Sequence, residues 1–199
     1  MWSRLSVGKP SGPRPFNPEF VVAKSVEEAV ALMAQGDAAL VSGGMSHALR
    51  RERTGYPQAK RLVSLARVPE LLEMGVDGVD AKGVLRIGSA VNQQRIYDDA
   101  KVKSGWQAIH DALEAVGHTR LRRMITVGGS IGPLIAGFDL PIALLALNAR
   151  VTVAGHSLTN GRRTLSLEEA FQKRFTKDEL VVSVEADALP ARTGSAFHK

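Results

Sequence analysis

Two glycine pairs, each following an extended segment, place the strongest constraint on how this 199-residue chain can fold. The first lies in Ser42-Gly43-Gly44-Met45-Ser46-His47, and the second in Thr126-Val127-Gly128-Gly129-Ser130. Glycine leaves consecutive backbone N–H groups unshielded, and such amide clusters bind anions, phosphate above all. Two such loops predict a clamp on an extended diphosphate, with ordinary structural turns as the alternative.

Short strands and amphipathic helices surround these loops in an irregular order. Capping boxes at Ser25–Glu28 and Ser166–Glu169 predict helix starts, and Asn160-Gly161 is typical of a hairpin turn. A helix with an apolar face is expected to end at Gly117, and another to begin near Pro141. The strands are predicted over residues 19–23, 38–41, 61–65, 84–89, 150–154 and 180–184. Because strict strand–helix alternation is missing, the pattern favours an α+β fold over a doubly wound parallel sheet.

The chain is expected to comprise three parts. Residues 1–15 are polar and proline-rich and predict a flexible N-terminal arm. Residues 16–55, with strand, helix, strand and first glycine loop, form a small lobe. Residues 56–199 form a larger lobe, whose first strand begins at Arg61.

Composition excludes several classes of function. The chain has no cysteine, so it holds no disulfide, thiolate zinc site or cysteine-ligated iron–sulfur cluster. No apolar run of about 18 residues and no secretory signal is present, which makes the cytoplasm the expected location. The net charge of +6 is scattered without interleaved aromatic residues, which favours a solvated surface or an acidic small ligand over nucleic acid.

Familiar catalytic and nucleotide-binding motifs are missing. The sequence has no Walker A motif, no GxGxxG and no GxSxG. No pair of its five histidines has helical metal-ligand spacing, so individually packed or solvated histidines are expected, with His47 set apart by its place in the first loop. We therefore predict no catalytic side chain and no metal site in this chain.

Asp139 is an isolated carboxylate in an apolar stretch, nine residues after the second glycine turn. Two interpretations stay open. Its side chain could cap the helix expected to begin near Pro141, or it could accept hydrogen bonds from a ligand held by the second turn.

The order of these motifs resembles the FAD-binding domain of the medium subunit of molybdenum hydroxylases, of the xanthine dehydrogenase and carbon monoxide dehydrogenase type. The resemblance runs from about Phe16 to Lys199 and includes both glycine loops, Asp139 and Leu144-Leu-Ala-Leu-Asn-Ala149. The sequence departs from the family pattern at four places. Ser42 replaces an alanine, Ser130 an asparagine, Ile125 a common glycine, and Arg120–Arg123 keeps only the arginine at Arg122.

The resemblance implies a two-lobed fold shared with the vanillyl-alcohol oxidase (PCMH-like) group, without the family's usual C-terminal domain. FAD would lie between the lobes. The loop residues 42–47 and 126–130 would hold the pyrophosphate, and Asp139 the ribityl or phosphate-proximal hydroxyls. Leu180 and Lys199 would lie near the isoalloxazine ring.

The implied function is electron transfer within a complex. The molybdenum cofactor would lie on a large subunit and the 2Fe-2S clusters on a small subunit, in a dimer of heterotrimers. Electrons would pass from these clusters to FAD and then to an external acceptor. The alternative is a structural subunit of the same kind of complex that has lost FAD.

Overall fold

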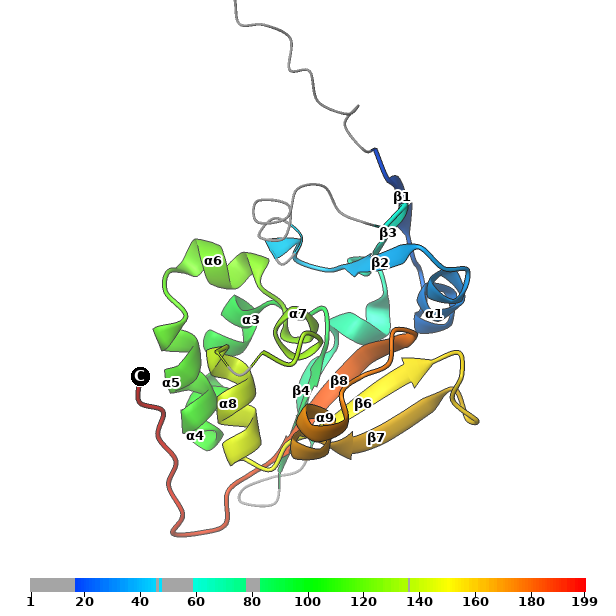
Figure 1. Cartoon of the computed structure of the whole chain (residues 1–199). Helices are drawn as coiled ribbons and strands as arrows, with labels where there is room; N and C mark the ends of the chain where they lie inside the picture. The colour runs from blue at the N-terminus through cyan, green and yellow to red at the C-terminus, as the bar shows by residue number, and fades with distance from the viewer. Residues whose placement is uncertain (1–16, 46, 48–58, 78–82, 136) are drawn as a thin grey trace, which may run out of the picture.

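The computed structural model describes residues 17–45, 47, 59–77, 83–135 and 137–199 (Figure 1). The expected N-terminal arm, residues 1–15, and the candidate residue Ser46 lie outside the described residues. Two β-sheets organise the rest of the chain. One is a three-stranded parallel sheet and the other a five-stranded antiparallel sheet, so the expected α+β class is confirmed.

The small sheet has the strand order β1-β3-β2. Its strands are β1 (Glu19–Val22), β2 (Ala38–Val41) and β3 (Arg61–Ser64). Helix α1 (Val26–Ala34) joins β1 to β2, and the Ser25 hydroxyl accepts a hydrogen bond from the Glu28 amide at 3.1 Å. The predicted cap is therefore confirmed.

The sequence-based assignment of the strand at Arg61 to the larger lobe was wrong. Strand β3 pairs in parallel with β1 on one side and with β2 on the other, and so forms the centre of the small sheet. A lobe boundary after residue 55 would separate this strand from both of its neighbours. Pairing between distant segments leaves no signal in local sequence patterns, which explains the error.

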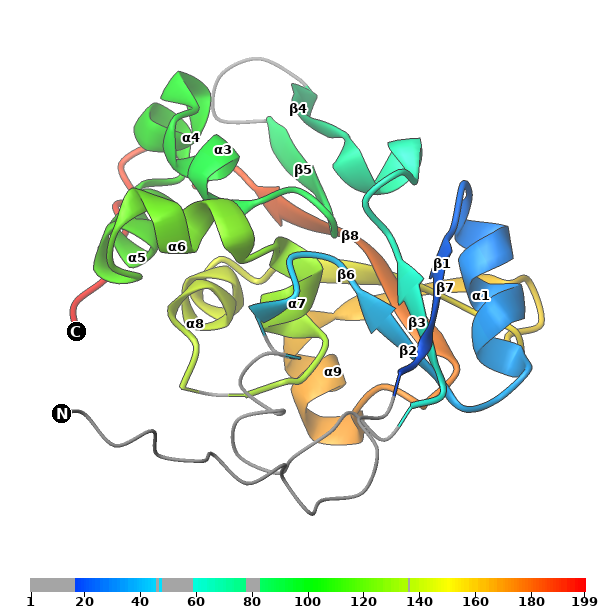
Figure 2. The ribbon, with the colours of Figure 1, turned by 90° about the horizontal axis from the view of Figure 1, so that it is seen from above.

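The large sheet has the order β4-β5-β8-β6-β7, with the longest strand at its centre (Figure 2). Its strands are β4 (Met74–Asp77), β5 (Val84–Gly88), β6 (Arg150–Gly155), β7 (Arg162–Ser166) and β8 (Glu179–Asp187). The 3-10 helix η1 (Pro69–Leu72) leads from the small sheet into β4. Gly161 has φ +69° at the end of the β6–β7 connection, which confirms the predicted hairpin.

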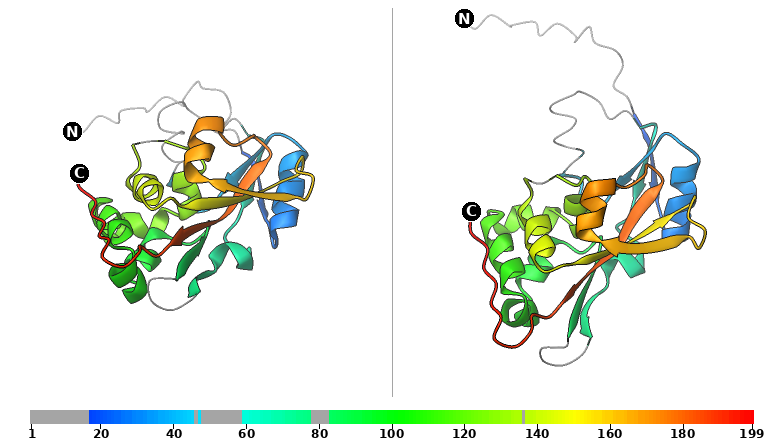
Figure 3. Two further views of the ribbon diagram at one scale, coloured as in Figure 1. Left: turned by 90° about the horizontal axis from the view of Figure 1, so that it is seen from below. Right: turned by 60° about the horizontal axis from the view of Figure 1, so that its bottom comes forward.

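A helical layer covers one end of the large sheet (Figures 1 and 3). Its members are α3 (Gln93–Tyr97), α4 (Ala100–Gly105), α5 (Gln107–Ala115), α6 (Thr119–Met124), α7 (Val127–Ile131) and α8 (Asp139–Ala146). Three helices, α3, α4 and α5, lie between residues 89 and 117, and only the one ending near Gly117 was predicted above. The side chains of Asn92 and Asp99 cap α3 and α4, and each cap begins a new helix.

Helix α9 (Leu167–Lys173) follows β7 and packs on β6, β7 and α8. Its predicted cap is confirmed, because Ser166 accepts a hydrogen bond from the Glu169 amide at 3.0 Å. Within the described residues, no helix is both long and apolar enough to cross a membrane.

Two apolar cores hold these layers together. The larger lies between the helical layer and the large sheet, and the indole N–H of Trp106 donates to the carbonyls of Ala186 and Asp187 at 3.1 and 3.2 Å. The smaller core lies between the small sheet, α1, η1 and the large sheet, and contains Val63, Leu71 and Val182. Because the second core draws on both sheets, the lobes share apolar packing.

The carboxylate of Glu179 at the start of β8 generates a testable pH dependence. Its side chain is only 2% exposed, and it accepts hydrogen bonds from Arg163 Nε at 2.6 Å and the Thr176 amide at 2.9 Å. Burial raises the pKa of Glu179, but the Arg163 and Thr176 hydrogen bonds outweigh it and hold the pKa below its usual value of 4.5. The pair therefore stabilises the fold above pH 4.5 and loses this contribution as pH falls through the lowered pKa.

We expect Glu179→Gln to lower the free energy of unfolding at pH 7 by about 2 kcal/mol, because three hydrogen bonds to a charged, buried group are weakened. The difference from the wild-type protein should shrink at pH 3. Urea unfolding at both pH values measures it. Glu73→Gln, at an exposed position, is the control. A difference that is the same at both pH values would contradict the prediction.

Candidate functional site

The two predicted glycine loops lie against each other (Figure 2). The first loop begins directly after β2, and a Cβ atom built on Gly43 would lie 1.5 Å from the carbonyl oxygen of Met124. The same atom would lie 3.5 Å from Cγ2 of Thr126, the first residue of the second loop. Only glycine fits here. The contact meets the requirement that both loops be close enough to serve one ligand.

The first loop presents bare backbone to open space. Gly44 has φ +79°, and a Cβ built on it would meet no atom within 4 Å. Among the residues that the structure describes, the amides of Gly43 and Gly44 have no hydrogen-bond acceptor, and the loop is partly exposed. These features fit a phosphate group, which needs free N–H donors and close approach of the backbone.

His47 contributes to the shape of the first loop through its side chain. Its Nε2 atom lies 2.7 Å from the carbonyl oxygen of Leu40 in β2. The ring therefore points back toward β2, and its contact with the Leu40 carbonyl connects the end of the loop to the strand. The sequence singled out His47 by its place in the loop, and the structure gives its ring a supporting contact.

The second glycine turn differs from its sequence-based prediction. It is the first turn of helix α7, capped by Thr126, whose Oγ1 accepts from the Gly129 amide at 3.2 Å. The amides of Val127, Gly128 and Ser130 donate to the carbonyls of Val91, Ser89 and Thr126 at 3.0, 2.7 and 3.1 Å. The amides of residues 127–130 are thus bonded within the chain in this structure, and their predicted role in holding the pyrophosphate stays a prediction.

Close packing explains the glycine at position 128. A Cβ built there would lie 2.8 Å from Cβ of Ser89 and 3.1 Å from its carbonyl oxygen. The Ser89 amide in turn donates to the carbonyl of Val182 at 2.8 Å. Ser89 therefore fastens the second turn to strand β8. Sequence reasoning missed Ser89, because its role arises from contacts between segments far apart in the chain.

Ser130 belongs to a buried polar network beneath the second turn. Its hydroxyl donates to the Thr126 carbonyl at 3.2 Å and accepts from Gln93 Nε2 at 2.9 Å. Two further polar atoms, Gln93 Oε1 and Ser89 Oγ, are buried and have no partner in the described part of the chain. Buried polar atoms need hydrogen bonds, so these two suit an ordered water molecule or a polar ligand beside the turn.

The structure brings two predicted residues, Asp139 and Lys199, together. Lys199 Nζ lies 2.9 Å from Asp139 Oδ2, although sixty residues separate them. The Asp139 side chain is 14% exposed and lies in the first turn of α8, where Phe138 is the N-cap residue and makes no side-chain cap. The capping interpretation of Asp139 is therefore not supported. A negative side chain is nonetheless favourable at a helix start.

Leu180 lies away from this pair. It pairs with Ala154 in the large sheet, and its side chain is 2% exposed within the smaller core. In the structure its side chain packs in this core, and its predicted place near the isoalloxazine ring stays a prediction. An apolar residue in a strand has the same sequence pattern whether its side chain packs in a core or contacts a ligand.

Arg122, the arginine kept from the family pattern, supports the helical layer. Its Nε donates to Gln94 Oε1 at 2.8 Å, and its guanidinium carbon lies 4.4 Å from the ring centre of Tyr97. Tyr97 stacks on His110 with ring centres 4.5 Å apart. Arg122 is only 7% exposed and also donates to the Gly117 carbonyl. It anchors α6, whose last residue, Met124, contacts Gly43.

One group of three potential metal ligands occurs among the described residues, in α5: His110, Asp111 and Glu114. Asp111 Oδ1 already accepts a hydrogen bond from Gln107 at 2.5 Å, and Glu114 is exposed. Consecutive helix positions diverge by about 100°, so His110 and Asp111 leave the helix in different directions, and only His110 and Glu114 share a helix face. We assign no metal here.

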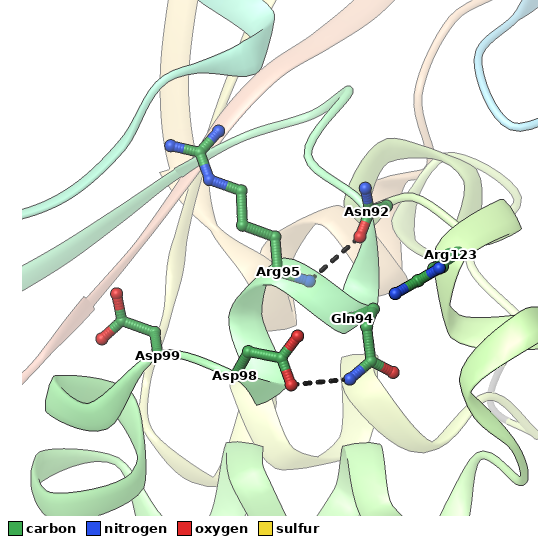
Figure 4. A pocket seen from close by; sticks show the side chains of 6 residues that line it. All are labelled: Asn92, Gln94, Arg95, Asp98, Asp99 and Arg123. Atoms are coloured by element: carbon green, nitrogen blue, oxygen red, sulfur yellow. Dashed lines mark hydrogen bonds between the residues drawn. The ribbon is translucent and has the colours of Figure 1, made fainter.

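An open pocket of about 510 Å³ lies beside α3, lined by charged and amide side chains (Figure 4). Its lining residues are Asn92, Gln94, Arg95, Asp98, Asp99 and Arg123. Local structure accounts for several of them: Asn92 Oδ1 accepts from the Arg95 amide at 3.0 Å, and Gln94 donates to Asp98 at 2.7 Å. None of the predicted site residues lines this pocket.

Comparisons with known proteins agree with this geometry. The family model described as the FAD binding domain in molybdopterin dehydrogenase matches residues 14–187. The alpha subunit of the 6-hydroxypseudooxynicotine dehydrogenase complex of Paenarthrobacter nicotinovorans is 30% identical over 191 residues. That alignment covers 92% of this chain and 62% of the relative. The glyceraldehyde dehydrogenase medium chain of Sulfolobus acidocaldarius is 27% identical, covering 87% of this chain and 62% of the relative.

The fold also matches solved structures. A carbon monoxide dehydrogenase from Hydrogenophaga pseudoflava aligns with a TM-score of 0.77 and 26% identity, covering 89% of this chain and 61% of the other. The chain thus spans about three fifths of the length of the proteins it matches. Because the family model covers most of the sequence, the chain belongs to the family of FAD-binding domains of molybdopterin dehydrogenases.

Proposed function

We propose that the protein holds FAD between its two lobes and acts as the electron-transfer flavin subunit of a molybdenum-containing dehydrogenase. The contact of Gly43 with the Met124 carbonyl carries this proposal, because it sets the first loop against the second with Gly44 open to solvent. Membership of the FAD-binding family supports it independently.

The two loops would make different contributions to binding the diphosphate. The amides of Gly43, Gly44 and Met45 would donate to phosphate oxygens, since the first loop is the partly exposed one. The second turn, with its amides bonded to Ser89 and Val91, would form a rigid wall behind the ligand. This division replaces the symmetrical clamp expected from the sequence.

The pair of Asp139 and Lys199 would hold a second part of the ligand. A carboxylate accepts hydrogen bonds from hydroxyl groups, and Lys199 Nζ at 2.9 Å keeps that of Asp139 oriented. Lys199 is 61% exposed and can donate to a ligand as well. When bound, FAD supplies the redox chemistry, and these side chains bind and orient it.

Electron transfer requires partner chains. The sequence contains no cysteine, so clusters ligated by cysteine must lie elsewhere. We place the 2Fe-2S clusters on a small subunit and the molybdenum cofactor on a large subunit, assembled as a dimer of heterotrimers in the cytoplasm. Names of relatives such as "complex subunit alpha" and "medium chain" support a multi-subunit assembly.

The visible spectrum and flavin content of the purified complex test the proposal. We expect flavin absorption bands and one FAD for each copy of this chain. A pure complex without flavin would overturn the proposal and favour a purely structural subunit.

Gly43→Val should abolish flavin retention, because its side chain would occupy the position of the Met124 carbonyl oxygen. Gly128→Val should also lose flavin, through its clash with Ser89. Gly75→Val is the matched control: a Cβ there meets no atom within 4 Å, in a strand of the same domain. Flavin content of the purified complexes measures all three. Wild-type content in both loop variants would contradict the site.

Asp139→Asn should weaken FAD binding about tenfold, because a charge-assisted acceptor is replaced by a neutral one. Ser130→Ala should change the FAD dissociation constant much less, since the Ser130 hydroxyl faces Gln93 and Thr126. Flavin fluorescence titration measures both constants. Equal effects of the two substitutions would argue against a direct role for Asp139.

A further inference from the structure

Arg174, the residue that ends helix α9, has a backbone conformation that only glycine normally adopts. Its φ is +65° and its ψ is 161°. A side chain in this region strains the backbone, and such strain persists where surrounding contacts enforce it. The residue is otherwise an ordinary helix end, because its amide donates to the Ala170 carbonyl at 2.9 Å. Because glycine would adopt this conformation without strain, an arginine at this position indicates that its side chain has a role.

The guanidinium of Arg174 reaches the segment between the second glycine turn and Asp139. Its Nη1 atom donates to the Leu134 carbonyl at 2.9 Å, and Nη2 lies 3.5 Å from the Pro133 carbonyl. Leu134 itself has φ +50° and is 5% exposed. Two non-glycine residues with positive φ are therefore joined by one hydrogen bond, forty residues apart in sequence.

The segment that contains Pro133 and Leu134 connects the second glycine turn, in α7, to Asp139, in α8. Helix α7 ends at Ile131, whose carbonyl accepts from the Leu134 amide at 2.9 Å, and α8 begins at Asp139. The path of the chain through Pro133 and Leu134 therefore sets where Asp139 lies relative to the second turn. Helix α9 is fixed on β6 and β7, so Arg174 ties this path to the large sheet.

We propose that Arg174 is a positioning residue for the flavin ligand: it holds Pro133 and Leu134 so that Asp139 faces the same ligand as the glycine loops. The inference rests on the proposed function. It explains why a strained arginine occupies a position where glycine would relax the backbone.

Arg174→Gly separates positioning from stability. Glycine relieves the backbone strain while removing the guanidinium, so the flavin-free protein should unfold at the same denaturant concentration as wild type or a higher one. The FAD dissociation constant should nevertheless rise about tenfold, because the charged donor to the Leu134 carbonyl is lost. The visible circular dichroism of bound flavin should change as well. All measurements use the full protein with its partner subunits.

Two further variants make the test specific. Arg174→Lys keeps the charge and the backbone strain but replaces the planar fork with a single ammonium, so its affinity should lie between those of wild type and Arg174→Gly. Arg192→Gly is the matched control. Arg192 also has φ +65°, is exposed and contacts no described residue through a hydrogen bond or ion pair. Its replacement should leave FAD affinity unchanged.

Distinct outcomes overturn the two proposals. Failure of the wild-type complex to bind FAD would remove the proposed function. Binding by wild type and equally by Arg174→Gly would remove only the role of Arg174. If Arg174→Lys bound FAD as tightly as wild type, charge alone would explain the loss of affinity in Arg174→Gly. If Arg192→Gly weakened FAD binding as much as Arg174→Gly does, general electrostatics would explain that loss. A loss of stability in Arg174→Gly that matches its loss of affinity would make the contact merely structural.

Discussion

The contact between Gly43 and the carbonyl of Met124 is the constraint on which the candidate site depends. It joins the end of the small sheet to the end of α6, two places that no local sequence pattern connects. Arg122 fixes α6 from within the helical layer, and Ser89 fixes α7 to β8. The bare backbone of the first loop is therefore presented by a framework that is anchored at several points. A preorganised framework of this kind limits the ordering cost of binding.

Local features of the fold were predictable from sequence. The caps at Ser25 and Ser166, the hairpin glycine at Gly161 and the α+β class follow from residue types at fixed offsets, and the structure confirms them. The position of β3 was not predictable in this way. The sequence of an apolar strand does not indicate which strands it pairs with, and Arg61–Ser64 pairs with strands on both sides.

The candidate site shows the same limit. Both glycine pairs were predicted to bind phosphate, but the sequence does not distinguish a glycine that faces open space from a glycine that packs against another chain segment. Gly44 faces open space, whereas Gly128 packs on Ser89. The amides of Val127 and Gly128 bond to the carbonyls of Val91 and Ser89, two residues outside α7, and the sequence gives no sign of these contacts. The contact between Asp139 and Lys199 was likewise visible only in three dimensions.

The strand order of the small sheet has a consequence for the order of folding. Its central strand is the last of its three strands in sequence, and its core also includes Leu180 and Val182 from near the end of the described chain. During synthesis, β1 and β2 have no strand partner until residue 64 has emerged, and the core that they share with α1 and η1 is incomplete until β8 is made. The core beneath the small sheet is therefore completed only after residue 182 has been synthesised.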